Sequence, residues 1–365
     1  MKECNTVKKI CILSDADSIH TRKWICFLSQ FDYEIHLISM RDTSYIFKEN
    51  VKKYIVESPI KSKLGYFMIP SKIKKLVKEI NPDVLHSHFA SSYGMFGALT
   101  KKKPFVVSVW GRDVYEFPKK NVVTKKILEN TLKRADVICS TSEDMAKETI
   151  KYCNKKLEDI VITPFGVDTN LFNMKKEILH NNVITVGVAK NLKPVYGIDL
   201  LIKAVKLLKD EREDIKIRIM VAGDGVERKN LEDLSKELEI GEIVNFLGNI
   251  DNIKIPEIMN EMDIVCLPSY EESFGVAAVE ASSCGRPVLA SYVGGLKETV
   301  IDGYNGFHFK KGDVEDIKDK LVKLIDDKEL MKVMGQNGRK MACSKYDWEN
   351  NAQIMKKLYD ELTNS

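Results

Sequence analysis

The sequence has no long apolar run, no Cys-x-x-Cys pair, no low-complexity tract and no short-period repeat. Without about 20 consecutive apolar residues, no segment is expected to cross a membrane as a helix. The eight cysteines lie mostly in apolar segments, which predicts reduced thiols in a cytosolic protein. The apolar run that follows Lys8 and Lys9 is too short for a secretory signal and predicts a first strand.

The remaining composition is that of an ordinary globular protein with unevenly distributed charge. The 365 residues are 44% hydrophobic and 30% charged, which favours two soluble domains over one. Residues 1–168 carry 29 Lys and Arg against 20 Asp and Glu, whereas the remainder carries 28 against 33. The two halves are therefore expected to face different partners, although charge alone does not distinguish nucleic acid, anionic membrane and anionic substrate.

Short apolar runs alternate with amphipathic segments, which predicts an α/β fold of parallel sheets covered by helices. Six candidate strands in each half indicate two doubly wound, Rossmann-like domains, joined by a linker at 163–176. Ligands of such folds bind beyond the carboxyl ends of the strands, so the predicted site is a cleft between the domains. The expected strands are 8–14, 34–39, 83–88, 105–110, 136–141, 159–164, 183–188, 216–223, 242–248, 263–269, 286–291 and 305–309.

The stretch EESFGVAAVEASSCGRPVLAS (271–291) places Glu280 inside an otherwise apolar helix that follows a strand and ends at Gly285. A glutamate in such a helix needs a hydrogen-bond donor or a cation, either inside the protein or on a ligand. The helix N-terminus attracts anions, and Gly275 lets a phosphate approach the backbone. Glu272, just ahead of it, suits neutral hydroxyl groups. A ligand that carries phosphates with a diol at one end and a polyol at the other is a nucleotide sugar. The alternative is structural, with Glu272 capping the helix and Glu280 paired with a Lys or Arg.

A spaced set of residues extends this pattern over about forty positions and resembles the donor-binding domain of the retaining GT-B glycosyltransferases of family 4 (glycosyl transferases group 1). The set is Pro268-Ser269-x-x-Glu272-x-Phe274-Gly275, Glu280-Ala281-x-x-x-Gly285-x-Pro287-Val288, Gly294-Gly295-x-x-Glu298 and Asp302-Gly303-x-Asn305-Gly306. The resemblance implies that Glu280 holds the ribose diol and that Glu272 contacts the hydroxyls of the donor sugar. It also implies that the N–H groups of Phe274, Gly275 and Val276 face sugar and diphosphate.

The resemblance covers almost the whole chain and implies a GT-B fold, with two Rossmann-like domains facing across a cleft. The acceptor-side domain would comprise residues 1–168 and a returning helix at about 346–365, and the donor-binding domain residues 169–345. The segment Val244–Asn249 is similar to the strand and loop beside the nucleotide base, which implies backbone contacts from Asn249 and Ile250. The nucleotide sugar is a substrate, so no cofactor is expected.

The loop 188–197 departs from the family pattern. The family usually supplies an Arg and a Lys five residues apart here, to neutralise the diphosphate, and this chain has neither at that spacing. We expect Lys190 to hold the diphosphate, with Lys193 second. The alternative for each is a solvated surface lysine.

In the first half, Asp83–His88 resembles the family's strand that ends in a pair of histidines. His88 would face the cleft, where a neutral imidazole can hold a sugar hydroxyl or relay a proton. His20, in the loop after the first strand, is a second candidate contact. Asp113 either contacts the acceptor or caps a helix.

The basic stretch 61–80 mixes six lysines with large apolar residues, which suits either an anionic membrane surface or a solvated helix. Dispersed lysines without a recognised motif disfavour nucleic acid.

The resemblance thus implies a retaining glycosyltransferase that moves a sugar from a nucleotide diphosphate, with UDP expected, to a glycan or lipid-linked acceptor. Glu272, His88 and Lys190 would be catalytic. No DxD-type motif stands at the donor site, so no metal is expected. The alternatives are a nucleotide-sugar 2-epimerase, an inactive nucleotide-sugar-binding protein and a solute-binding protein, the last of which would need export.

Overall fold

The computed structural model describes residues 7–57, 68–179 and 183–364. The chain divides into two compact units. Unit 1 is Met1–Pro164 together with Glu349–Ser365, and unit 2 is Phe165–Trp348. The first crossing between them falls inside the expected linker 163–176, which contains no helix or strand. The second falls at the start of the last helix, α15 (Trp348–Asn364).

Unit 1 contains a seven-stranded sheet in which every paired strand is parallel. The chain moves outward from β1 to β3 and then returns to place β4 on the other side of β1, so the direction of winding reverses between β1 and β4. The strands in spatial order are β3 (Val51–Ile55), β2 (Tyr33–Ser39), β1 (Lys8–Leu13), β4 (Val84–His88), β5 (Phe105–Val109), β6 (Val137–Ser140) and β7 (Ile160–Ile162).

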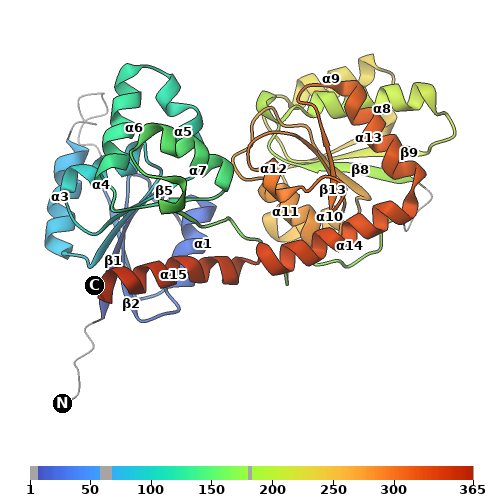
Figure 1. The fold of residues 1–365 in the computed structure, drawn as a ribbon. Helices are drawn as coiled ribbons and strands as arrows, with labels where there is room; N and C mark the ends of the chain where they lie inside the picture. The colour runs from blue at the N-terminus through green and yellow to red at the C-terminus, as the bar shows by residue number, and fades with distance from the viewer. Residues whose placement is uncertain (1–6, 58–67, 180–182, 365) are drawn as a thin grey trace. The chain divides into compact units, whose positions relative to one another are not determined.

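Helices cover both faces of this sheet (Figure 1). One face carries α3, α4 and α6, whose apolar residues join the strands in a single core that includes Ile73, Phe96 and Leu132. The opposite face carries α1 and α15. The other described α-helices of unit 1 are α1 (Ile19–Leu28), α3 (Ile69–Ile80), α4 (Ser92–Thr100), α5 (Arg112–Tyr115), α6 (Val122–Arg134) and α7 (Glu143–Thr149).

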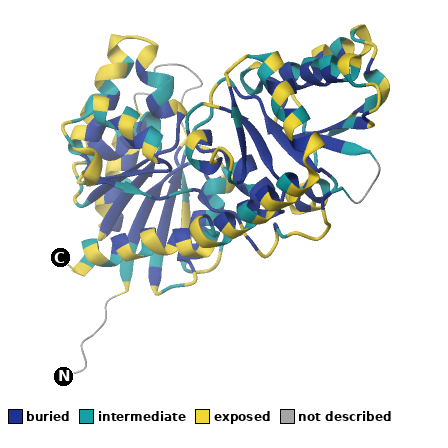
Figure 2. Cartoon of the chain, turned by 45° about the vertical axis from the view of Figure 1, so that its right-hand side comes forward, coloured by how far each residue is buried: buried dark blue, intermediate teal, exposed yellow. Residues whose placement is uncertain are grey.

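Unit 2 repeats the plan with a six-stranded parallel sheet, and its winding reverses between β8 and β11. In spatial order the strands are β10 (Val244–Gly248), β9 (Ile217–Ala222), β8 (Ile184–Ala189), β11 (Ile264–Leu267), β12 (Val288–Ser291) and β13 (Gly306–Phe309). Its helices are α8 (Ile198–Glu211), α9 (Arg228–Glu237), α10 (Ile255–Asn260), α11 (Val276–Ser283), α12 (Leu296–Thr299), α13 (Val314–Asp326) and α14 (Lys328–Lys345). The strands of both sheets are mostly buried (Figure 2).

The α/β prediction of two doubly wound sheets is confirmed, but the expectation of six strands in the first half is wrong. The strand that was not predicted, β3, lies at the edge of its sheet and includes the exposed Lys52 and Lys53. An edge strand needs no continuous apolar run because one side of it faces solvent. Within the described ranges, no helix is both long and apolar enough to cross a membrane.

Candidate functional site

In unit 2, the predicted donor residues gather at the point where the winding of the sheet reverses. In open parallel sheets, ligands bind beyond the carboxyl ends of the two strands that flank such a point. Here those strands are β8 and β11. Lys190 directly follows β8, and Glu272 lies in the loop after β11. The topology alone therefore brings a cation and a carboxylate to the same edge.

Lys190 and Glu272 form a close ion pair, with 2.5 Å between Nζ and Oε2. Their side chains are only 14% and 12% exposed, so Lys190 is not a solvated surface lysine. Its ammonium also lies 4.6 Å from the centre of the Tyr196 ring. Burial is the largest single influence and lowers the pKa of Lys190, but the charge and hydrogen bond of Glu272, together with Tyr196 and Glu280, raise the pKa above its ordinary value. Lys190 is a cation held in place at the sheet edge.

Two glycines allow the loops that carry this pair to pack closely. At Gly223, with φ +141°, a Cβ would lie 1.9 Å from the carbonyl oxygen of Lys190. At Gly294, with φ +45°, a Cβ would lie 1.8 Å from the carbonyl oxygen of Glu272. The N–H of Gly295 donates to that same oxygen at 3.0 Å. The glycines therefore fix the backbone beneath each partner of the ion pair.

The helix α11 begins beside Glu272, and Gly275 is its N-cap with φ +92°. The Glu272 carboxylate pairs with Lys190, and among the described residues no backbone N–H of α11 donates to it, so the alternative in which Glu272 caps the helix does not hold. Most of α11 is buried, as expected, but Glu280 and Val276 are half-buried. Glu280 is close enough to Lys190 to contribute to raising the pKa of its ammonium. The charges of three predicted donor-site residues, Lys190, Glu272 and Glu280, are thus close enough to interact.

The remaining donor-side predictions lie around this centre. Phe274 is buried and packs edge-on against Phe165 and Tyr346, so only its backbone is available to a ligand. Lys193 is exposed. Asn249 and Ile250 follow β10, two strands from β8 and hence about 10 Å from Lys190 across the sheet.

In unit 1, the winding reverses between β1 and β4, and His88 is the last residue of β4. Its Nδ1 lies 2.9 Å from the hydroxyl of Ser14, the residue after β1. The Ser14 hydroxyl lies 2.7 Å from that of Thr21 on α1. Burial, with smaller contributions from the neighbouring His86 and His20, lowers the pKa of His88 far below its usual range. The imidazole of His88 is therefore neutral at pH 7.

Aromatic rings surround His88. The ring of Trp110 lies 4.3 Å away, and His20 meets the same indole edge-on at 5.9 Å. Burial and the charge of Lys23 lower the pKa of His20 to about 4. The structure thus brings two predicted contacts, His88 and His20, against one indole.

Asp113 follows Trp110 closely in the chain, and its carboxylate faces backbone N–H groups. One oxygen accepts from the N–H of Ala90 at 2.8 Å, and the other from Trp110 and Gly111 at 3.2 and 2.9 Å. Burial raises the pKa of Asp113, although these N–H donors oppose the shift. The carboxylate holds together the loops after β4 and β5.

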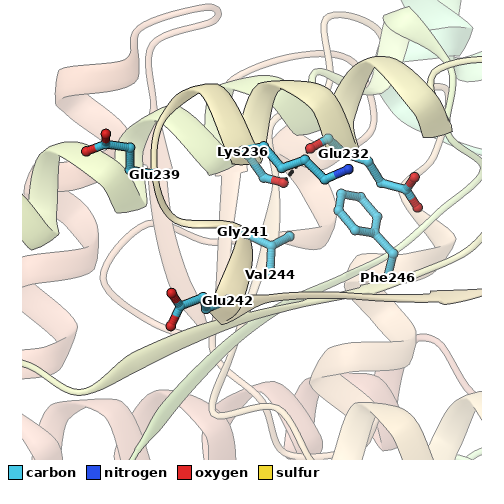
Figure 3. A pocket seen from close by; sticks show the side chains of 8 residues that line it. Glu232, Lys236, Glu239, Gly241, Glu242, Val244 and Phe246 are labelled. Atoms are coloured by element: carbon cyan, nitrogen blue, oxygen red, sulfur yellow. Dashed lines mark hydrogen bonds between the residues drawn. The ribbon is translucent and has the colours of Figure 1, made fainter.

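A separate hollow of about 490 Å³ lies between α9 and the edge strand β10 (Figure 3). Phe246 and Val244 form its apolar floor, and Glu232, Lys236, Glu239 and Glu242 stand around it. None of the predicted site residues lines it. The hollow therefore lies apart from the residues predicted to hold the donor.

The prediction missed three residues that the structure places at these edges, namely Ser14, Thr21 and Tyr196. Tyr196 stands in the loop where the family pattern has a lysine, which is the one sequence signal that could have directed attention to it. Ser14 ends the predicted strand 8–14 and Thr21 adjoins the predicted contact His20, but the link from Thr21 through Ser14 to His88 depends on how β1, α1 and β4 meet.

Known proteins are similar to this chain over most of its length. The family models Glycosyl transferases group 1 and Glycosyl transferase 4-like match residues 171–341 and 9–142. An uncharacterized glycosyltransferase of Methanocaldococcus jannaschii is 32% identical over 311 residues, which cover 82% of each chain.

Two solved structures share the fold. Sucrose-phosphate synthase from Thermosynechococcus elongatus superposes with a TM-score of 0.83 at 19% identity, over 98% of this chain and 99% of that one. Anabaena HepE, solved in complex with UDP, gives 0.81 at 21% identity, over 97% and 100%. The chain belongs to the group 1 glycosyltransferases, family 4, and has their GT-B fold.

Proposed function

We propose that this glycosyltransferase moves a sugar from a nucleotide diphosphate, with UDP as the expected carrier, to a hydroxyl of a glycan or lipid-linked acceptor. The observation that carries the proposal is the Lys190–Glu272 pair at the β8/β11 edge. In a nucleotide sugar, the anionic diphosphate adjoins the neutral sugar. A cation beside a carboxylate suits that junction, since one meets phosphate oxygens and the other accepts from hydroxyls. That the similar HepE is described in complex with UDP supports the choice of carrier.

In this proposal, each side chain has one task. Lys190 offsets the negative charge that grows on the diphosphate as the bond from its oxygen to the anomeric carbon breaks. Glu272 orients the sugar through its hydroxyls, and Glu280 accepts from the ribose diol. The free N–H groups at the start of α11 face the phosphates.

Retention of configuration follows from attack on the face that the diphosphate leaves. The acceptor oxygen bonds to the anomeric carbon, and its proton passes to the departing phosphate. The sequence shows no carboxylate obviously placed as a covalent nucleophile. Lys190 and the helix N-terminus would supply the positive charge without a metal.

Thermal-shift measurements with UDP, GDP, ADP and their common sugar conjugates, without added metal, test the donor site. A ligand that binds only the native state raises the unfolding midpoint. We expect one nucleotide to stabilise the wild type and to lose most of this effect in Glu280→Ala. The matched control Glu232→Ala, on α9, should keep it. Stabilisation by no nucleotide, or an unchanged response of Glu280→Ala, would contradict the proposed donor site.

We also propose that the enzyme works in the cytoplasm and that its basic first unit contacts an anionic membrane surface. The described part of the stretch 61–80 forms α3, whose apolar residues Ile69, Ile73, Val77 and Ile80 are buried in the core. Lys72, Lys74, Lys75 and Lys78 point to solvent, and residues 61–67 lie outside the described ranges. Sedimentation with vesicles containing phosphatidylserine should therefore pull down the protein at low salt and release it at high salt. Equal recovery with neutral vesicles would refute this contact.

A further inference from the structure

Three polar side chains, Thr21, Ser14 and His88, form a buried chain of hydrogen bonds at the β1/β4 edge. The contacts are 2.7 Å between the two hydroxyls and 2.9 Å from Ser14 Oγ to His88 Nδ1. Thr21 and Ser14 are fully buried and His88 is 2% exposed. Each hydroxyl has one proton to donate, and a neutral imidazole has one. The three protons can therefore be ordered in three ways along the chain, because Ser14 has one proton and cannot donate to both neighbours at once.

In the first order, Thr21 donates to Ser14, Ser14 donates to Nδ1 of His88, and the ring proton lies on Nε2. Every buried hydroxyl proton then has an acceptor. In the second order, Nδ1–H donates to Ser14 and Ser14 donates to Thr21. The Thr21 proton is then left over, and no acceptor other than Ser14 lies within hydrogen-bond distance of it among residues 7–57, 68–179 and 183–364. In the third order, Thr21 and Nδ1–H both donate to Ser14, whose own proton then has no acceptor within those ranges. A buried donor without a partner costs about 1–3 kcal/mol, so the first order is the stable one.

The other ring nitrogen is the one available to a ligand. In the described part of the chain nothing pairs with Nε2, yet this nitrogen is not among the polar atoms that are both sealed from solvent and unpartnered. Trp110 and His86 flank the ring at 4.3 and 4.7 Å and limit its rotation.

We propose that Ser14 and Thr21 are positioning residues that hold His88 in its Nε2–H tautomer, so that His88 acts on the substrate as a hydrogen-bond donor and not as a base. The group it meets is an acceptor oxygen, such as that of a sugar hydroxyl or a phosphate. This inference rests on the proposed function for its substrate and narrows the two roles expected of His88 to one. His88 then does not take the proton of the attacking hydroxyl. That proton passes to an oxygen of the departing phosphate.

The test reads the tautomer directly and needs neither donor nor acceptor. In protein labelled with ¹⁵N-histidine, long-range ¹H–¹⁵N spectra at pH 7 separate a protonated from an unprotonated ring nitrogen. His88→Gln identifies the signals, among six histidines. We expect wild-type His88 to show a protonated Nε2 and an unprotonated Nδ1. The opposite assignment in the wild type would overturn the proposal.

Variants then test the positioning residues. Ser14→Ala removes the one partner that Nδ1 has within the described ranges and should bring the two His88 nitrogen shifts toward each other, as expected for a mixture of tautomers. Thr21→Val should do so more weakly, because Ser14 keeps its own proton. The matched control is Ser108→Ala, which removes the hydroxyl 2.8 Å from Nε2 of His86 and should move only the His86 signals. His88 shifts unchanged in Ser14→Ala would refute the role of Ser14. Since glycosyl transfer is not measured, failure here is separate from failure of the proposed donor site.

Discussion

The two sheets have the same parallel topology, yet their reversal points carry opposite chemistry. At the β8/β11 edge, a half-buried lysine and carboxylate meet at 2.5 Å. At the β1/β4 edge, neutral imidazoles, hydroxyls and an indole meet, and burial keeps the histidines uncharged. The fold supplies the place where a ligand binds, and the side chains at the strand ends decide whether that place suits a charged group or a neutral one.

The charge at each reversal point also does not follow from the net charge of the half of the sequence that contains it. The excess of Lys and Arg lies in residues 1–168, but the side chains in contact with His88 at the reversal point there are uncharged. The half with excess Asp and Glu contains the fixed lysine. Net charge describes the solvent-exposed surface, where most lysines lie, and says little about a site built from a few half-buried groups.

The largest effect on stability is expected from adding a Cβ at Gly294, next to the Glu272 carbonyl. Gly294→Ala should lower the free energy of unfolding by about 3 kcal/mol, because its Cβ would collide with the Glu272 carbonyl at a positive φ. Gly303→Ala is the matched control, since Gly303 also has a positive φ of +75° but nothing within 4 Å of its Cβ, and it should lose about 1 kcal/mol. Urea unfolding followed by circular dichroism measures both. Equal losses would show that the close approach is unimportant.

Removing the cation from the charged edge comes next. Lys190→Gln should lower kcat/KM for the donor about 100-fold, since it takes away the positive charge that faces the leaving group. Lys203→Gln, which breaks an exposed ion pair with Asp199 on α8, should change it less than about twofold. A loss of less than about fivefold in the Lys190 variant would assign the diphosphate to other groups.

Lowering the pH should lower the free energy of unfolding of unit 1, which contains the buried histidines. Burial lowers the pKa of His86 to about 3, from an ordinary value near 6.5. Below pH 6.5 the unfolded chain therefore binds a proton that the native state refuses, and the free energy of unfolding of unit 1 falls as the pH falls. His86 alone accounts for about 2 kcal/mol between pH 6.5 and 5.

Hydrogen exchange measures how much each unit loses stability as the pH falls. Within the described ranges, every histidine whose pKa is lowered, namely His20, His36, His86 and His88, belongs to unit 1. After correction for intrinsic rates, amide protection in β4 and β5 should fall more from pH 7 to pH 5 than protection in β11 and β12. A uniform loss over both units would speak against the histidines as the cause.

The smallest expected effect concerns the ring beside Lys190. Tyr196→Leu should raise KM for the donor about two- to fivefold, because a cation over an aromatic face gains about 0.5–1 kcal/mol. Tyr196→Phe keeps the ring and should match the wild type. A large effect of the phenylalanine variant would assign the role to the hydroxyl.

The sequence was sufficient for the features that depend on local pattern. Alternating apolar runs predicted both doubly wound sheets, and the glycine and proline after α11 predicted its end. Lys190 and Glu272 were each predicted as site residues, but their ion pair spans 82 positions and follows only from the order of the strands. The half-buried state of Glu280 was missed because an apolar helix does not reveal which of its sides the sheet covers. The edge strand β3 was missed because Lys52 and Lys53 interrupt its apolar pattern.

The helix α15 has a consequence for synthesis. Its residues from Glu349 onward complete unit 1, where the Tyr359 hydroxyl lies 2.5 Å from His86 Nδ1 and Asp360 accepts from Tyr33 at 2.7 Å. Unit 2 is thus one uninterrupted stretch, inserted between two pieces of unit 1. On the ribosome, unit 1 is begun first but waits for α15 until all of unit 2 has been translated. The unit that starts first is therefore completed last, with its buried histidine lacking the tyrosine partner until then.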